Sequence, residues 1–230
     1  MIKKKEILKL RNEKKYNINY VDGFILSQKL KKFFRYDKNS DSHGNYRVSS
    51  LYFDTPSDKA LMQNMSGINQ REKFRIRYYN NDLSFIRLER KIKINGRCAK
   101  QTALLSKTDV QKILDGEINF LLQKDDALAI EFYSKLRGQL LKPKTIVTYD
   151  REAFIYHPGN VRITIDRNLR TTTKIDVFMQ INKHINVSDG LAVLEIKYDE
   201  FLPDLVKMAV CLDNRPLTAY SKYIVSRKYD

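Results

Sequence analysis

The sequence predicts an α+β fold in which about eight antiparallel strands close into a β tunnel flanked by short helices. Three observations lead to this prediction. Segments rich in Ile, Val, Tyr, Phe and Thr outnumber the helical ones, several of them alternate between apolar and basic residues, and 230 residues suffice for one barrel with a substantial core. We therefore expect a single domain over residues 1–230.

Nine segments have the composition of β-strands. They are rich in β-branched and aromatic residues, which fit a pleated surface. Their ranges are 7–20, 46–54, 72–80, 84–94, 98–105, 144–157, 161–167, about 174–181 and 191–198. The polar stretch 168–190 has the weakest pattern, and we expect a mobile excursion there.

Short helices are expected between the strands. The clearest start signal is a capping box, in which Ser106 and Asp109 open a helix that ends at Gly116. A longer helix over residues 125–141 carries an apolar stripe that we expect to pack against the barrel, made of Leu128, Phe132, Leu136 and Leu140. The other expected helices cover 22–35 after Asp22, run from Thr55 and Pro56 to Gly67, and follow Pro203 and Tyr220.

Five of the strands place apolar residues on one face and charged, mostly basic residues on the other. Phe74 and Ile76, for example, alternate with Arg75 and Arg77, and the same pattern holds in 8–15, 84–94, 162–166 and 194–197. If such a sheet stays flat, its cationic face is a platform for nucleic acid. If the sheet closes, the cationic face lines a bore and the apolar face receives the helices.

The density of charge favours a wet tunnel that holds a polyanion. So many like charges cannot face each other across a dry interior, because their repulsion at low dielectric is prohibitive. In a single strand, a solvated outer face would explain the charge, but five concordant strands favour the tunnel. Nucleic-acid binders usually interleave stacking aromatics with basic residues, whereas Phe53 and Phe74 fall on the opposite face. This distribution favours phosphate over bases.

The whole chain carries a formal net charge of +16, from 43 Lys and Arg against 27 Asp and Glu. This excess indicates a nucleic acid, a membrane surface or a phosphorylated small molecule as partner, although a solvated basic surface has the same composition. Cys98 and Cys211 lie in no metal-binding spacing and the three histidines are scattered, so no zinc site is expected. Without an export signal or a membrane-spanning apolar run, we expect a cytoplasmic protein.

Seven motifs follow one another in the order that one known family shows. They are SSLYFDT at 49–55, REKFRIRYY at 71–79, RLERKIK at 87–93, TYDREAF at 148–154, VRITID at 161–166, LEIK at 194–197 and YSKY at 220–223. Through them, nearly the whole chain resembles the catalytic domain of the vacuolar transporter chaperone (VTC) polyphosphate polymerases, which are triphosphate tunnel metalloenzymes. The resemblance implies a closed antiparallel β tunnel flanked by helices.

The resemblance also implies which residues bind the phosphates. Tyr149 and Ser221 are implied as further binding residues, and the catalytic cations are Lys15, Arg75, Arg77, Lys91, Lys100, Arg151, Arg162 and Lys222. Glu195 is implied as a ligand of Mn²⁺ or Mg²⁺, although it could instead neutralise a neighbouring arginine. Lys222 could instead cap a helix C-terminus, Tyr149 could be structural, and Glu89 is expected to orient Lys91 as its ion-pair partner.

Two departures from the family pattern bear on the reaction. Ala219 stands where eukaryotic members have a second lysine. The hydrolase branch of the superfamily opens with Glu-x-Glu-x-Lys, whereas this chain has Arg-Asn-Glu-Lys-Lys at 11–15, with Arg11 in place of the first glutamate. Fewer carboxylates therefore remain for a metal ion, which weighs against a hydrolase or a cyclase.

The function that the resemblance implies is transfer of the γ-phosphoryl group of ATP to a growing inorganic polyphosphate chain, with Mn²⁺ or Mg²⁺ as cofactor. ATP and polyphosphate are the expected partners, and nucleic acid is not expected. We expect no membrane span, and a membrane-protein partner is left open. Three other functions also stay open: a triphosphatase on the same fold, a non-catalytic module that binds polyphosphate, and a nucleic-acid binder that uses the basic face.

Overall fold

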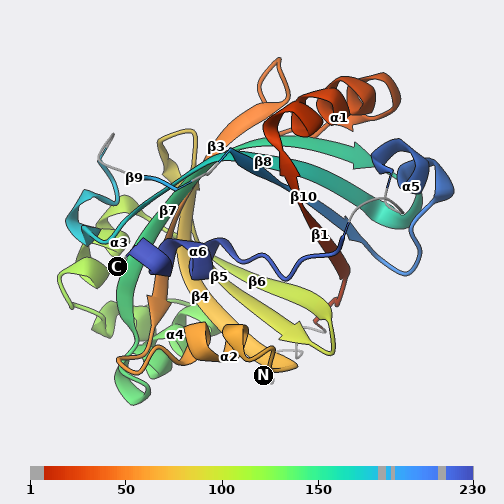
Figure 1. The fold of residues 1–230 in the computed structure, drawn as a ribbon. Coiled ribbons are helices and arrows are strands. Elements are labelled where there is room, and N and C mark those ends of the chain that lie inside the picture. Colours follow the sequence, from red (N-terminus) through yellow and green to blue (C-terminus); the bar gives the residue numbers. More distant parts are fainter. Residues whose placement is uncertain (1–7, 181–184, 188–189, 212–215, 230) are drawn as a thin grey trace.

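The protein is described by a computed structural model, which covers residues 8–180, 185–187, 190–211 and 216–229 of the 230-residue chain. Within these ranges, one sheet of ten strands curves around a central opening (Figure 1). Along its main path the strands follow the order β1, β10, β8, β7, β3, β4, β5, β6, while β2 pairs with β7 and β9 pairs with β8. The predicted α+β tunnel fold is confirmed.

The strands are β1 (Asn12–Asn19), β2 (Arg35–Tyr36), β3 (Asn45–Asp54), β4 (Gln70–Tyr79), β5 (Asp82–Ile94), β6 (Arg97–Leu105), β7 (Lys142–Tyr156), β8 (Val161–Thr172), β9 (Ile185–Asn186) and β10 (Leu191–Tyr198). The α-helices are α1 (Tyr20–Phe33), α2 (Lys59–Met65), α3 (Lys107–Leu114), α4 (Ala127–Gly138), α5 (Asp204–Val210) and α6 (Lys222–Ser226). Short 3₁₀ helices occupy Asn119–Gln123, Pro158–Asn160, Ile175–Val177 and Arg227–Tyr229. No helix in the described part of the chain has the length and hydrophobicity needed to cross a membrane.

The tunnel closes at one bridge rather than along a full ladder, which corrects the prediction of a closed sheet. Arg11 and Cys98 exchange two backbone hydrogen bonds, of 2.9 and 2.8 Å, where the start of β1 passes the start of β6. Beyond this bridge, the C-terminal segment 216–223 contacts β1. The N–H of Thr218 donates to the carbonyl of Lys15 at 2.9 Å, so this segment lies against β1 and crosses the tunnel in Figure 1.

The outer face of β3, β4 and β5 is apolar and packs under α4. Phe74 and Leu88 are almost completely buried there. Phe132 of α4 stacks on Phe74 with 5.4 Å between ring centroids and meets Phe53 edge-on at 5.0 Å. The period-two alternation of a strand then turns the residues between these apolar ones toward the tunnel.

The opposite wall of the tunnel is built in the same way. Leu194 and Ile196 of β10 are fully buried beneath Leu30 of α1 and Val206 of α5. Figure 1 shows α1 and α5 on the outside of this wall. Both walls therefore bury their apolar faces under helices and leave their polar faces to the tunnel, as the alternation predicts.

Local capping explains where the first and third helices begin. Ser106 and Asp109 exchange the two hydrogen bonds of the predicted capping box, and α3 follows. By contrast, α1 begins at Tyr20, earlier than predicted, because the side chain of Asn19 accepts a hydrogen bond of 2.8 Å from the N–H of Asp22.

Two helix predictions were wrong in detail. The helix expected at Pro56 begins at Lys59, because the buried carboxylate of Asp54 accepts hydrogen bonds from the N–H groups of Ala60 and Leu61 at 2.8 and 3.0 Å. Leu140 does not pack against the barrel. Helix α4 ends at Gly138, and Leu140 follows with 58% of its surface exposed.

The strand predicted over 174–181 was also wrong as far as the structure describes it. Ile175–Val177 form a 3₁₀ helix, and Phe178 is buried beside Tyr78, whose hydroxyl donates to the Phe178 carbonyl at 2.7 Å. The backbone of these three residues is helical rather than extended, so it joins no ladder of the sheet. Nor is 168–180 an excursion, because β8 continues to Thr172; residues 181–184 and 188–189 lie outside the described residues.

Candidate functional site

The tunnel contains a cavity of about 450 Å³ that is lined mainly by charged and aromatic side chains. All eleven residues that the motifs single out line this cavity: Lys15, Arg75, Arg77, Lys91, Lys100, Tyr149, Arg151, Arg162, Glu195, Ser221 and Lys222. They come from β1, β4, β5, β6, β7, β8 and β10 and from the start of α6. The structure thus brings the whole predicted set together from positions spread over most of the chain.

On β4 and β5, a buried carboxylate holds two of the predicted cations. Glu89 has no exposed surface, and it accepts from Arg75 at 2.6 Å and from Lys100 at 2.9 Å. Arg77 lies 3.7 Å away and donates instead to the hydroxyl of Ser50 at 2.8 Å. Burial by itself would raise the pKa of Glu89, but the cations outweigh it and hold this pKa well below its usual range.

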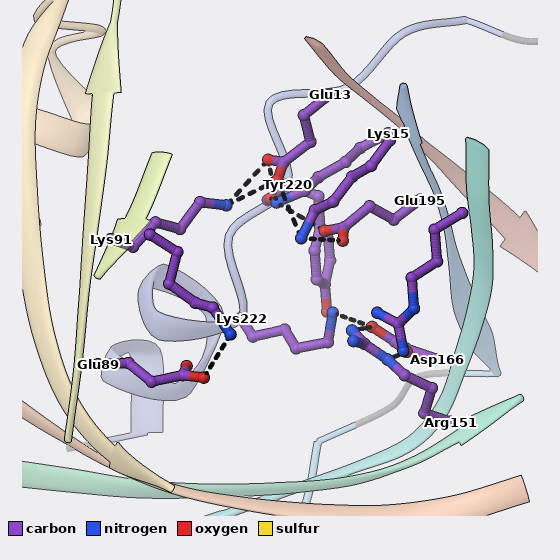
Figure 2. A network of polar contacts seen from close by, with 12 residues as sticks. Glu13, Lys15, Glu89, Lys91, Arg151, Asp166, Glu195, Tyr220 and Lys222 are labelled. Atoms are coloured by element: carbon purple, nitrogen blue, oxygen red, sulfur yellow. Dashed lines mark hydrogen bonds and ion pairs between the residues drawn. The ribbon is translucent and has the colours of Figure 1, made fainter. Parts of the chain in front are cut away.

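The expectation that Glu89 orients Lys91 was therefore wrong. The ammonium group of Lys91 points to Glu13 instead, with Nζ–O distances of 2.8 and 3.0 Å (Figure 2). Strand register explains the difference. Arg75 lies directly opposite Glu89 across the ladder, whereas Lys91 lies opposite Lys73.

A second network surrounds two carboxylates, one of which the motifs did not single out. Lys15 lies 3.2 Å from Glu13 and 3.5 Å from Glu195, and Lys197 lies 3.0 Å from Glu195 and 3.7 Å from Glu13. Figure 2 shows Lys15 between the two glutamates. The pKa values of both carboxyls are lowered because these lysines outweigh the effect of burial.

Glu13 could have been found from the sequence. It lies two residues before Lys15, so strand alternation places both on the same inner face, where Glu13 ↔ Lys197 and Lys15 ↔ Glu195 are register pairs between β1 and β10. Arg11 replaces the first glutamate of the hydrolase pattern, but the second glutamate, Glu13, is present. Lys73 and Lys197 were missed as well, although both share the inner face with motif residues.

The third network joins β7, β8 and α6. Arg151 donates to both oxygens of Asp166, at 2.6 and 2.7 Å, and Lys222 lies 2.6 Å from the same carboxylate. Burial alone would raise the pKa of Asp166, but Arg151 and Lys222 bring it down to about 2. Because Lys222 is the first residue of α6, the alternative that it caps a helix C-terminus is wrong.

Tyr149 and Ser221 connect these networks. The ammonium group of Lys222 lies over the ring of Tyr149, 4.7 Å from the ring centroid. The hydroxyl of Tyr149 accepts a hydrogen bond from Arg77 at 3.2 Å. The hydroxyl of Ser221 caps α6 and lies 3.2 Å from Nζ of Lys73. Both residues therefore contact cations of the cavity.

Arg162 is placed differently from the other predicted arginines. Its Nε and Nη2 contact Asp37 at 2.9 and 2.8 Å, and Nη2 also contacts the hydroxyl of Tyr46. Asp37 lies in the loop after β2 rather than on a tunnel strand. Arg162 lines the cavity but is held from outside the three networks.

The carboxylate oxygens of Glu13 and Glu195 fit a hard divalent cation. Such ions prefer oxygen donors and often take part of their coordination from substrate phosphates and water. No group of three His, Cys, Asp or Glu side chains arranged to hold a metal occurs among the residues that the structure describes. A divalent cation held by Glu13 and Glu195 would keep coordination positions for phosphate oxygens and water.

Comparisons with known proteins agree with this fold. A family model described as the VTC domain matches residues 10–229. The fold is similar to candidate adenylate cyclases from Bacillus halodurans (11% identity, TM-score 0.52, 89% of this chain and 87% of that chain covered) and from Vibrio parahaemolyticus (14%, 0.51, 95% and 98%). It is also similar to a Pyrococcus horikoshii protein (15%, 0.50, 94% and 98%). Among curated proteins, none matches significantly.

At these identities the solved structures establish the fold alone. The family model adds more, since it spans almost the entire chain and includes every strand of the tunnel and the C-terminal helix. The cavity that these elements enclose is lined by the motif residues in the arrangement given above. The chain belongs to the VTC domain family and has the triphosphate tunnel fold.

Proposed function

We propose that this chain is a polyphosphate polymerase, which transfers the γ-phosphoryl group of ATP to the end of an inorganic polyphosphate chain. The observation that carries the proposal is the composition of the cavity. Its described lining has cations on seven strands and on the C-terminal segment, but only the carboxylates of Glu13 and Glu195. A linear polyanion is the ligand class that neutralises such an excess along its length.

The reaction needs positioning and charge neutralisation more than covalent help from the protein. The terminal oxygen of the polyphosphate forms a bond to the γ-phosphorus, the bond between that phosphorus and the β–γ bridging oxygen breaks, and ADP leaves. The attacking oxygen is already anionic, so no general base has to remove a proton. The described lining of the cavity accordingly contains no histidine.

The arginines are suited to hold the reacting phosphates. A guanidinium group donates two parallel hydrogen bonds to a pair of phosphate oxygens, and Arg75 and Arg151 are each oriented by a buried carboxylate. The lysines Lys15, Lys91 and Lys222 provide further positive charge from other walls. A divalent ion at Glu13 and Glu195 would supply additional charge to the transferring group.

A triphosphatase is the second candidate, and the position of Glu13 favours it. This carboxylate lies in the cavity beside Glu195, so water could be oriented there as acceptor in place of a phosphate end. The comparison of ATP-derived products distinguishes the two candidates. ATP as donor, Mn²⁺ or Mg²⁺ as cofactor and a cytoplasmic location all belong to the polymerase proposal.

Incubation of the purified chain with ATP and Mn²⁺ tests the proposal. We expect acid-insoluble polyphosphate and ADP in amounts that match the phosphoryl groups transferred. Free phosphate with ADP and without polymer would indicate a triphosphatase. Binding of tripolyphosphate without turnover would indicate a binding module, and binding of nucleic acid alone would contradict the tunnel reading.

A further inference from the structure

One inner row of the tunnel brings three lysines together on neighbouring strands. Lys73 of β4 lies directly opposite Lys91 of β5, which lies directly opposite Lys100 of β6. In the adjacent row, Arg71 lies opposite Lys93. Like charges directly across a ladder destabilise a sheet, so this arrangement opposes folding unless something else offsets it.

The three lysines differ in what neutralises them. Lys91 lies 2.8 Å from Glu13, and Lys100 lies 2.9 Å from Glu89. Lys73, in contrast, has no carboxylate within ion-pair distance among the described residues. Among the described residues, its ammonium group contacts two neutral groups: the hydroxyl of Ser221 at 3.2 Å and the ring of Tyr223, whose centroid is 5.4 Å away.

Positive charge also surrounds Lys73. The charged groups that face it are Arg71 and Arg75 on its own strand, Lys91 on β5 and Lys15 on β1, while α6 offers Ser221 and Tyr223. Burial, and then the repulsion from these four cations, holds the pKa of Lys73 well below its usual range. An anion placed among these groups would reverse the repulsion.

We propose that Lys73 and Ser221 form a phosphate subsite of the tunnel, and that Lys73 takes up a proton when a polyphosphate chain occupies it. This inference rests on the proposed function, because it assumes that a polyanion enters the cavity. The ligand class is a phosphate group of an inorganic polyphosphate or of a nucleoside triphosphate. Lys100, by contrast, already has a carboxylate partner in Glu89, so it serves as the matched control in the same row.

Calorimetric titration with tripolyphosphate, repeated in buffers of different ionisation enthalpy, measures both affinity and proton uptake. At about pH 9 a normal lysine, with its pKa near 10.4, is still protonated. Proton uptake at this pH therefore comes from lysines whose pKa is lowered in the free protein. Lys93 and Lys197 also have lowered pKa values, chiefly through burial, and remain in every variant. The difference between the wild type and Lys73→Met therefore isolates Lys73.

We expect Lys73→Met to weaken binding about tenfold to a hundredfold and to reduce the proton uptake. The affinity of the wild type should fall as the pH rises through the free-state pKa of Lys73, and the variant should lose this part of the dependence. Lys100→Met, in the same row, should weaken binding without reducing the uptake. Lys107, exposed on α3, is the control for the loss of one charge. Lys107→Met should leave the affinity for tripolyphosphate and the proton uptake unchanged.

Thermal unfolding without ligand tests whether Lys73 binds phosphate or instead stabilises the fold. A lysine whose pKa is lowered on folding destabilises the folded state, because the unfolded chain holds its proton more readily. Lys73→Met removes this cost and should raise Tm, by about 1–4 °C. A lower Tm would show that Lys73 mainly anchors α6 and would overturn the proposal, as would unchanged affinity and proton uptake in Lys73→Met. If instead the wild type fails to bind tripolyphosphate, the proposed function is wrong and not merely the role of Lys73.

Discussion

Two walls of the tunnel use the same residue types with different degrees of neutralisation. On β7 and β8, Arg151 and Lys222 share the buried carboxylate of Asp166. On β4, β5 and β6, Glu89 serves Arg75 and Lys100, while Lys73 in the same region has no acidic partner among the described residues. Where each cation has a carboxylate partner, the ion pairs fix the positions of the side chains. Where a cation such as Lys73 has none in the described part of the chain, its charge is available to a ligand.

The largest effect is expected on the wall with excess charge. Arg75→Ala with Arg77→Ala should nearly abolish phosphoryl transfer, because two arginines facing the cavity are lost. Each charge-assisted contact contributes about 1.5–3 kcal/mol to binding and more in the transition state. Turnover of ATP to polymer, together with calorimetric affinity for tripolyphosphate, measures the loss. Near-normal activity would show that the tunnel does not bind the substrate.

A third change controls for folding. Removing Arg75 and Arg77 leaves the fully buried Glu89 with Lys100 as its remaining close partner, which should lower the free energy of unfolding. Adding Glu89→Gln removes the buried charge and should restore stability without restoring turnover. If Glu89→Gln restored both stability and turnover in the double arginine variant, the arginines would serve only to neutralise Glu89. The proposed difference between the two walls would then be wrong.

On the wall of β7 and β8, the ion pairs of Asp166 should make the stability of the protein depend on pH in acid. Asp166, with its pKa lowered to about 2, stays ionised in the folded protein after an unfolded aspartate has begun to protonate near pH 4. This carboxylate therefore contributes about 2 kcal/mol to stability at neutral pH, which is lost as the pH falls from about 4 to about 2.

Urea unfolding at stepped pH measures this contribution. In Asp166→Asn, which keeps one acceptor oxygen for Arg151, the loss over the same pH window should be smaller by about 2 kcal/mol. Equal pH profiles for the two proteins would mean that Asp166 is not the group whose charge holds Arg151 and Lys222 in place.

The smallest effect is expected at the paired glutamates. Glu195→Gln and Glu13→Gln should each raise the Mn²⁺ concentration needed for half-maximal activity by about tenfold, because each removes one charged oxygen ligand. Binding of tripolyphosphate without metal should be preserved in both. A titration of Mn²⁺ against activity and against tripolyphosphate affinity measures the two effects. An unchanged metal dependence in Glu195→Gln would identify Glu195 as an ion-pair partner of Lys15 and Lys197 only.

The alternation of residues was enough to predict the face on which each charge lies. Strand side chains have a period of two, so Arg75 and Arg77 had to share a face opposite Phe74 and Ile76 once the strand was recognised. The same reasoning placed Lys15 and Glu195 inside the tunnel. The positions of the other motif residues, among them Ser221 and Lys222 at the start of a helix, were implied by the resemblance to the family rather than by this rule.

The partner of each charge could not be predicted in the same way. Lys91 is paired with Glu13 because the start of β1 meets the start of β6 at one bridge, and nothing local to either residue encodes that contact. The C-terminal segment contacts β1 through Thr218 and Lys15, which are equally remote in sequence. Register and closure are tertiary properties, so local patterns leave them open.

The central claim is that the cationic face lines a bore rather than an exposed platform. Displacement of labelled tripolyphosphate by unlabelled polyphosphate and by duplex DNA, at one fixed ionic strength, tests it most directly. Duplex DNA, whose major groove alone is about 12 Å wide, cannot enter a bore of about eight strands, whereas a bare phosphate chain can. We expect polyphosphate to displace the label and DNA to compete poorly at the same phosphate concentration. Comparable displacement by DNA would contradict the tunnel and favour a nucleic-acid-binding surface.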